Sequence, residues 1–419
     1  MRNWGLHLLL VLFLFVQHGT NIKVSADNEF ISSNGVHFIL NGSYYYANGF
    51  NAYWLMVVAS DPSQTDKVSS LFQEAVSNGL ALARTWAFND GGSQALQFSP
   101  GVYNEQMFQG LDFVIYEAGR YGIKLILSLV NNYKDYGGKS QYVNWARDQG
   151  QSISSDDDFY TNSLVKGFYK NHINTVLNRR NSITGVSYKD DNTIMAWELM
   201  NEARCTSDPS GNTLQAWITE MASYVKSVDT KHLLEVGLEG FYGESAPADK
   251  QFNLTVKLGT DFIANNQIPS IDFATIHLYP DQWIPDSDEE TQQAFSENWI
   301  NTHIQDTRAI LQKPLLVAEF GWKNTGFDTK TREELLRSVY SDIYLSARCG
   351  GVAAGSMFWQ LLAEGLDSYR DGYEVVLDES HTTACLISEQ SQKLIRIREM
   401  FARRRHTKEN ETMNNNVGC

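Results

Sequence analysis

The chain has 419 residues, of which 42% are hydrophobic and 20% are charged, and its formal net charge is −15. This length allows one large α/β barrel or two ordinary domains, each with a sizeable core. The acidic balance argues against nucleic acid as a partner, because phosphates bind to basic surfaces.

The first 26 residues predict a secretory signal peptide. Arg2 provides a positive charge, residues 8–16 form a short apolar stretch, and residues 24–26 (Val-Ser-Ala) are small residues suited to cleavage. An uncleaved membrane anchor is the alternative, but the apolar stretch is too short to span a bilayer comfortably. We therefore expect a secreted protein with no membrane partner, whose mature chain begins near Asp27.

Secretion permits disulfides and N-glycans, but the sequence does not assign them. Four cysteines allow three complete pairings and define no framework: Cys205, Cys349, Cys385 and Cys419. Three Asn-X-Ser/Thr sequons are candidate glycosylation sites: Asn41, Asn253 and Asn410.

A β-hairpin is predicted over residues 30–42, with its turn at Asn34-Gly35. This hairpin precedes the first of a series of alternating strands and helices. We therefore expect it to cover the bottom of the barrel that this series predicts. Strand-like and helical segments then alternate along the chain. Strands are predicted to begin near Tyr45, Leu80, Lys124, Thr193, Leu233, Asp272, Pro314 and Val352, and helices to cover 66–77, 107–120, 214–228, 332–347 and 388–401.

Eight alternating units predict a (β/α)8 barrel formed by a single domain, residues 27–402. The alternative is a doubly wound open sheet, which often binds ligands through a G-x-G-x-x-G turn, and the chain has no such turn after a strand. Two long loops, 131–158 and 364–384, follow predicted strands and should wall the site at the C-terminal face. The polar tail, residues 403–419, is expected to be disordered.

Two glutamates stand at the ends of apolar strands. Glu202 follows the run 194–200, and Glu319 follows 314–318. The C-terminal ends of barrel strands carry the chemistry of such folds, and two facing carboxylates are the minimal requirement for glycoside hydrolysis. A single glutamate at such a place is more often a helix cap or an ion-pair partner, so the prediction depends on the pair.

Other polar residues end neighbouring strands. His277 and Tyr279 are two positions apart, so a strand directs both to the same side. Asn201 and Glu202 are adjacent, so both can face one site only if the strand ends or bulges there. No second histidine lies at ligand spacing from His277, so we expect no metal, and no motif suggests a cofactor.

Several spaced motifs resemble plant endo-β-1,4-mannanases of glycoside hydrolase family five, whose clan carries its catalytic glutamates on strands four and seven. The similarity runs from about Phe30 to the last helix. The motifs are Arg-Thr-Trp-Ala-Phe-Asn-Asp-Gly at 84–91, Trp-Glu-Leu-Met-Asn-Glu at 197–202, His-Leu-Tyr-Pro at 277–280, Val-Ala-Glu-Phe-Gly at 317–321 and Phe-Trp-Gln at 358–360.

The resemblance implies a retaining double displacement, with Glu202 as general acid/base and Glu319 as nucleophile. Arg84 and Tyr279 would hold the nucleophile, and His277 would contact the acid/base side of the site. The remaining implied sugar contacts are Asn201 to a 2-hydroxyl, Trp359 as a platform, Arg204 on the leaving-group side, and Trp86 and Trp283 more loosely.

One position departs from the family pattern. Relatives usually carry Pro after the acid/base glutamate, where this chain has Ala203. Pro would fix its own φ and restrict Glu202, whereas Ala can adopt the same angles at an entropic cost. We expect the site to survive this change.

The sequence therefore predicts a secreted, monomeric endo-β-1,4-mannanase that cuts mannan, glucomannan and galactomannan in cell walls. Alternatives are a related β-1,4-glycanase, a mannan transglycosylase or, in a different class, a non-catalytic carbohydrate-binding barrel. The presence of both glutamates together with Arg84 and Tyr279 argues against the last alternative.

Overall fold

The computed structural model describes residues 29–246, 252, 258–323 and 329–416. The predicted signal peptide (1–26), the sequon at Asn253 and Cys419 lie outside these residues. Within them, Cys205, Cys349 and Cys385 are free thiols.

The N-terminal strands form a small antiparallel sheet of β1 (Ser32–Asn34), β2 (His37–Leu40) and β3 (Ser43–Tyr45). The predicted hairpin is present, but its turn is one residue later than predicted, because Asn34 pairs with His37 and leaves Gly35 and Val36 as the loop. Gly35 has φ +55°, so glycine takes the first loop position, where a positive φ is needed.

This small sheet covers the bottom of the barrel, as predicted. The Phe38 ring on β2 packs edge-on against Phe273, with ring centroids 5.1 Å apart. Phe273 immediately precedes β11 (Ala274–Leu278), so the contact lies at the N-terminal ends of the barrel strands.

Eight parallel strands form the barrel, in the order β10-β9-β8-β5-β4-β13-β12-β11. All eight predicted strands are confirmed, and every residue in them is buried, which explains why they read as apolar runs. Their bounds are β4 Ala47–Asn51, β5 Leu82–Trp86, β8 Lys124–Ser128, β9 Ile194–Glu198, β10 Leu233–Glu235, β11 Ala274–Leu278, β12 Leu315–Phe320 and β13 Ala353–Phe358.

The seam of the barrel lies between β10 and β11, the two ends of that strand order. Two backbone hydrogen bonds cross it. The amide of Asp272 donates to the Leu234 carbonyl over 2.8 Å, and the amide of His277 donates to the Glu239 carbonyl over 2.9 Å. These bonds bring the end strands together and almost close the sheet.

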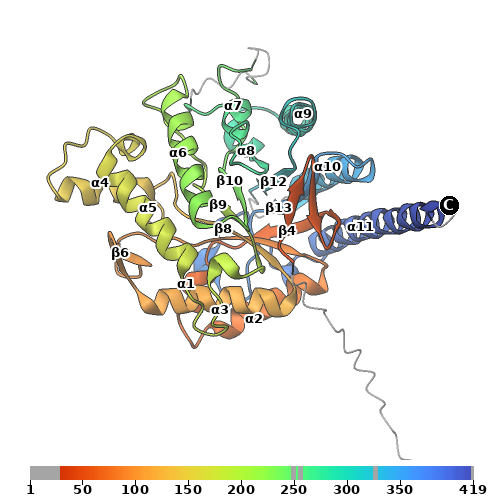
Figure 1. Ribbon diagram of the computed structural model, residues 1–419, viewed down its shortest axis with the longest axis horizontal. Helices are drawn as coiled ribbons and strands as arrows, with labels where there is room; N and C mark the ends of the chain where they lie inside the picture. Colours follow the sequence, from red (N-terminus) through yellow and green to blue (C-terminus); the bar gives the residue numbers. More distant parts are fainter. Residues whose placement is uncertain (1–28, 247–251, 253–257, 324–328, 417–419) are drawn as a thin grey trace, which may run out of the picture.

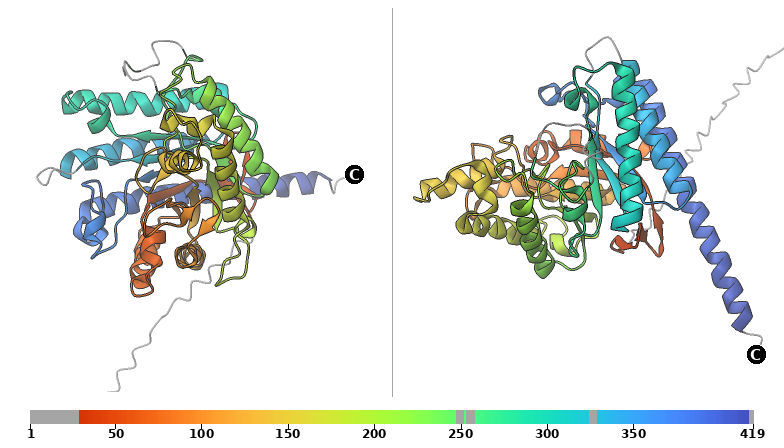
Figure 2. Two further views of the ribbon diagram at one scale, coloured as in Figure 1. Left: turned by 90° about the vertical axis from the view of Figure 1, so that its left-hand side faces the viewer. Right: turned by 90° about the horizontal axis from the view of Figure 1, so that it is seen from above.

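Helices surround the strands (Figures 1 and 2). Helix α3 shows why they form: the Asn104 side chain caps its first turn, an apolar face is buried, and Gly122 ends it in a left-handed conformation. The helices are α1 Leu55–Ala59, α2 Thr65–Ser77, α3 Glu105–Tyr121, α4 Gly138–Asp148, α5 Ser163–Asn178, α6 Asn212–Val228, α7 Phe262–Asn266, α8 Pro280–Trp283, α9 Glu289–Asp306, α10 Thr329–Arg348 and α11 His381–Asn416.

Helix α11 extends beyond the barrel (Figures 1 and 2) and continues to Asn416. Residues 403–416 of the tail that was expected to be disordered therefore belong to a helix, and residues 417–419 lie outside the described residues. The prediction of disorder was based on the polarity of the tail and did not include helix propensity. Helix propensity is high at four of its positions: Lys408, Glu409, Glu411 and Met413.

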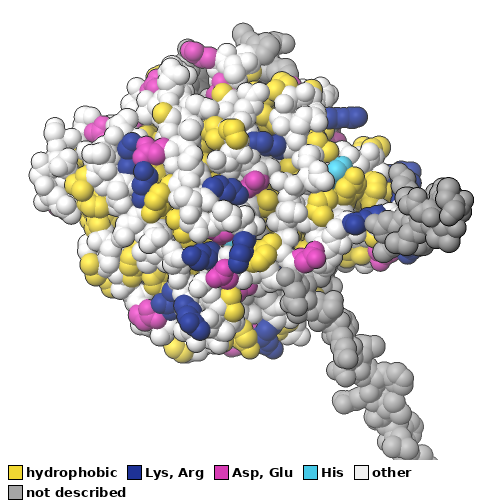
Figure 3. All heavy atoms as spheres, in the orientation of Figure 1, with side chains coloured by type: hydrophobic (Ala, Val, Ile, Leu, Met, Phe, Trp, Pro, Cys, Tyr) yellow, Lys and Arg dark blue, Asp and Glu magenta, His cyan; other side chains and the backbone are white. Residues whose placement is uncertain are grey.

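The surface gives two further findings. On the face shown in Figure 3, acidic and basic side chains are interspersed rather than gathered into one large basic patch. Among the described residues, no helix combines the length and the apolar character that crossing a bilayer requires.

Candidate active site

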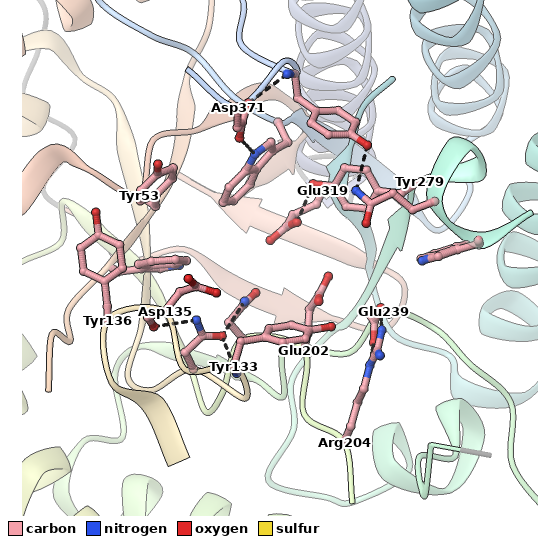
Figure 4. Close-up of a pocket in the computed structure, with 17 residues that line it drawn as sticks. Tyr53, Tyr133, Asp135, Tyr136, Glu202, Arg204, Glu239, Tyr279, Glu319 and Asp371 are labelled. Atoms are coloured by element: carbon pink, nitrogen blue, oxygen red, sulfur yellow. Dashed lines mark hydrogen bonds and ion pairs between the residues drawn. The ribbon is translucent and has the colours of Figure 1, made fainter. Parts of the chain in front are cut away.

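A cleft of about 500 Å³ opens at the C-terminal ends of the barrel strands (Figure 4). Both predicted long loops contribute to its walls: the first supplies Asn131, Tyr133, Asp135 and Tyr136, and the second supplies Asp371 and Tyr373. Of the ten predicted site residues, Arg84 and His277 lie buried beneath the cleft. The other eight line it: Trp86, Asn201, Glu202, Arg204, Tyr279, Trp283, Glu319 and Trp359.

Asn201 and Glu202 both face the cleft because strand β9 ends before them, at Glu198. Asn201 pairs with Asn131 in an isolated bridge, and its Nδ2 donates to Asn131 Oδ1 over 3.0 Å. Glu202 then adopts φ +52°. The left-handed conformation costs a non-glycine residue about 1–2 kcal/mol, and such strain is typical of functional positions.

Glu319 is directed into the barrel by a bulge in β12. Ile276 pairs with Val317 and His277 pairs with Glu319, so Ala318 is an extra residue on its strand. The side chain of Asn51, at the end of β4, donates to the Ala318 carbonyl over 2.8 Å. This bond holds the bulge that aims the carboxylate.

Arg84 connects the two sides of the site from below. Its Nη1 donates to Glu319 Oε1 over 2.5 Å, and its Nη2 donates to Asn201 Oδ1 over 2.7 Å. Its Nε and Nη2 also form a fork on Glu198, at 2.5 and 2.7 Å. One guanidinium therefore orients the Glu319 carboxylate and the Asn201 amide at the same time, which a lysine could not do.

His277 on β11 and Tyr279, which follows that strand, hold the two carboxylates. The Tyr279 hydroxyl donates to Glu319 Oε2 over 2.7 Å. His277 Nδ1 lies 2.7 Å from Glu202 Oε1 and 3.6 Å from Glu319 Oε2. One oxygen of Glu202 and one of Glu319 lie within 4.8 Å of each other. Because Arg84 already places a cation against Glu319, this cluster suits proton transfer better than metal binding.

The pKa shifts of Glu319 and Glu202 are opposite in direction to those that favour an ionised nucleophile and a protonated general acid. Burial raises the pKa of Glu319, more than His277 and Arg84 lower it. Burial also raises the pKa of Glu202, but its hydrogen bond with His277 and the charge of His277 lower it overall. The reason is the position of His277: a protonated Nδ1 donates to an ionised Glu202, whereas an unprotonated Nδ1 accepts the proton of the acid form.

Arg204 forms a fork on Glu239, with Nε to Oε2 at 2.6 Å and Nη2 to Oε1 at 2.5 Å. Burial and the negative charge of Glu202 raise the pKa of Glu239 to about 7, although Arg204 opposes the shift. This end of the cleft therefore offers charged hydrogen-bonding groups beside Glu202.

Aromatic rings occupy the other end. Trp359 lies parallel to Tyr53, with centroids 5.4 Å apart and 7° between the planes, and Tyr53 in turn contacts Trp86 at 4.9 Å. The Trp359 indole donates to Asp371 Oδ2 over 2.7 Å, which fixes the orientation of the ring. Flat apolar faces with polar groups between them suit the binding of sugar rings.

The structure adds residues for which no role was predicted from the sequence. Glu198 belongs to the motif at 197–202. A charged residue within an otherwise apolar strand could have indicated that it has a role in the site. Asn51 is a polar residue at the end of the first barrel strand, which is the same signal that marks the residues at the other strand ends. Glu239, Tyr53 and Asp371 lie in segments without a distinctive local pattern, so only the fold brings them to the cleft.

Comparison with known proteins gives consistent matches. A family model described as "GH family 5 beta-mannosidase-like" matches residues 28–367. Mannan endo-1,4-beta-mannosidase 7 of Arabidopsis thaliana is 60% identical over 376 residues, which cover 89% of this chain and 87% of the relative. Mannan endo-1,4-beta-mannosidase 1 of Oryza sativa subsp. japonica is 59% identical over 417 residues, covering 97% and 96%.

Solved structures agree with these relatives. The endo-beta-1,4-mannanase from Thermotoga petrophila superposes with a TM-score of 0.73 at 33% identity, covering 84% of this chain and 78% of that chain. The endo-1,4-beta-mannanase from Rhizomucor miehei gives a TM-score of 0.74 at 31% identity, covering 88% and 100%.

Proposed function

The chain belongs to the glycoside hydrolase family 5 β-mannosidase-like family, and on that premise we propose that it is an endo-β-1,4-mannanase acting by double displacement. The resemblance seen in the sequence is thereby confirmed, and the chain is a glycoside hydrolase. The proposed substrates are mannan, which the relatives' names specify, and its glucomannan and galactomannan forms in cell walls.

The observation that carries the proposed mechanism is the separation of the two carboxylates. Retaining enzymes place them about 5–5.5 Å apart, and inverting enzymes about 6.5–9.5 Å apart to admit a water molecule. One oxygen of Glu202 and one of Glu319 lie within 4.8 Å of each other, and this short separation supports the retaining arrangement.

In the first step, Glu319 attacks the anomeric carbon while Glu202 protonates the departing oxygen, which leaves a covalent glycosyl–enzyme. In the second step, Glu202 takes a proton from water, and that water displaces Glu319 with overall retention. Arg84 and Tyr279 donate to Glu319 and stabilise its carboxylate when it leaves.

Substrate contacts follow from the positions of the neighbouring groups. Asn201, held by Arg84 and Asn131, is placed to bind the 2-hydroxyl of the reacting sugar, and Trp359 is placed as its platform. Arg204 and Glu239 would bind the sugar on the leaving-group side. Trp86 and Trp283 line the cleft and would contact more distant sugars.

The two carboxylates can be assigned by azide trapping. With E319A, azide should occupy the vacated space and give an α-mannosyl azide. With E202A and an aryl mannoside that needs little protonation, azide should rescue the second step and give a β-mannosyl azide. Products of the opposite configurations would reverse the two roles. Full activity in both variants would refute this site, whereas a wild type that binds mannan without hydrolysing it would favour a carbohydrate-binding barrel.

Substrate class is tested by comparing kcat/KM on mannan, cellulose and xylan. Mannose has an axial 2-hydroxyl where glucose has an equatorial one, so polar groups set for one epimer are left unpaired by the other. We expect a clear preference for mannan. Equal values on mannan and cellulose would support a broad β-1,4-glycanase, and longer products from short mannans would support a transglycosylase.

We also propose that the protein is secreted as a monomer. The apolar N-terminal segment and small residues at 24–26 support export and cleavage. N-terminal sequencing of secreted material should find a start near Asp27, and an intact Met1 would contradict this. Sedimentation should give the mass of one chain.

A further inference from the structure

A second pair of glutamates lies behind Arg84, outside the cleft. Glu198 on β9 and Glu235 on β10 are directly opposite each other in the parallel register. Both are fully buried. Since residues in register on adjacent strands point to the same side, both side chains enter the barrel interior.

The hydrogen bonds show which of the two carboxyl groups carries charge. Both oxygens of Glu198 accept from Arg84, at 2.5 and 2.7 Å. Glu235 Oε2 accepts from the Gly237 amide at 2.5 Å and from the Thr275 hydroxyl at 3.0 Å. Within the described part of the chain, no donor group faces Glu235 Oε1. Glu198 is therefore the better-stabilised anion.

The two carboxyl groups face each other from paired positions of β9 and β10 and are placed to share a hydrogen bond. Two carboxylates offer only acceptors, so this bond requires one proton between them. Glu235 Oε1 accepts no hydrogen bond from the described residues, so this oxygen can carry the shared proton. Burial raises the pKa of Glu235 well above its usual range, and the charge of Glu198 raises it further.

The charge balance around Arg84 depends on that proton. Arg84 is one buried cation in contact with Glu198 and Glu319. If Glu235 were ionised, a third buried carboxylate would compete for the same cation, and uncompensated buried charge is costly. The charged or titratable groups that face Glu235 are Glu198 from β9 and Arg84 from β5, while Thr275 from β11 does not titrate.

We propose that Glu235 is a positioning residue that remains protonated during turnover and donates its proton to Glu198, so that Arg84 stays available to hold Glu319. Glu235 does not line the cleft and acts only through Glu198 and Arg84. The proposal rests on the role of Glu319 as nucleophile stated above. Glu235 is thus a residue that the reaction needs although it touches no substrate.

The first test is infrared difference spectroscopy of the full chain, which needs no substrate. The spectrum of the wild type minus that of E235Q at neutral pH should contain the carbonyl stretch of a protonated carboxyl group. A carboxylate band in its place would show that Glu235 is ionised and would overturn the proposal. E117Q is the matched control: Glu117 on α3 is equally buried, lies outside the cleft and pairs with Arg120.

The second test is kinetic. Gln is neutral and can donate to Glu198, so E235Q should keep kcat/KM on mannan within about threefold. Met fills a similar volume without a donor, so E235M should lower kcat about tenfold or more, with little change in KM. E117Q should change neither parameter.

The outcomes separate the two proposals. If E235M turns over like the wild type, Glu235 has no positioning role, whatever its protonation state. If E235M does not fold, E235L takes its place, judged against the Tm of E235Q. An inactive wild type would instead refute the proposed function and leave the infrared result intact.

Discussion

Replacing Tyr279 by Phe isolates one interaction of the proposed nucleophile. The Tyr279 hydroxyl donates to Glu319 Oε2 over 2.7 Å, and the variant keeps the ring while removing this donor. A hydrogen bond to a charged group contributes about 1.5–3 kcal/mol. One pKa unit corresponds to about 1.4 kcal/mol. Loss of the donor should therefore raise the pKa of Glu319 by about 1–2 units.

The assay is the pH profile of kcat/KM on a soluble manno-oligosaccharide. Because the nucleophile must be ionised, the acidic limb of the profile should move to higher pH by about 1–2 units. The matched control is Y242F, since Tyr242 donates to Asp306 over 2.8 Å and does not line the cleft. An unmoved acidic limb in Y279F, with Tm preserved, would refute the role given to this bond.

Three further variants test other parts of the site. W359A removes the ring that stacks on Tyr53 and should raise KM about tenfold, by loss of about 1–3 kcal/mol of stacking and buried area; an unchanged KM on mannan would exclude the platform role. R84M leaves Glu198 and Glu319 without their cation and should lower the free energy of unfolding by about 3–5 kcal/mol, as measured by urea denaturation. Glu239 has a folded-state pKa raised from 4.5 to about 7, so its contribution to stability is full below about pH 4.5 and is lost as the pH rises through about 7. E239Q should therefore lose less Tm than the wild type between about pH 5 and about pH 8, and an identical loss would contradict the shift.

Features that depend only on residues adjacent in the sequence could be predicted from it. The eight strands appear as apolar runs because both faces of each strand are buried, and Glu202 and Glu319 stand out because they end such runs. The position of the hairpin turn was misplaced by one residue, because Gly35 alone supplies the positive φ that the loop needs.

Residues defined by contacts between distant strands could not be predicted in the same way. The extra residue Ala318 appears only when β12 is paired with β11, and Asn51 becomes important only because it holds that bulge. Glu235 reads as an ordinary strand residue until the register sets it against Glu198. The stacking of Tyr53 on Trp359 joins positions from the two ends of the chain.

The seam between β10 and β11 has a consequence for how the enzyme gains activity as it folds. Glu202 follows a strand on one side of the seam, and His277 and Glu319 come from strands on the other. A chain in which helices and most strands have formed, but the two edges have not met, lacks the contact between His277 and Glu202. The barrel also needs the pairing of β4 with β13, and pairings between segments so distant in the chain form late, because their loop-closure entropy is large. In refolding experiments, hydrolytic activity should thus recover after far-ultraviolet circular dichroism, and the delay would measure the time the barrel takes to close.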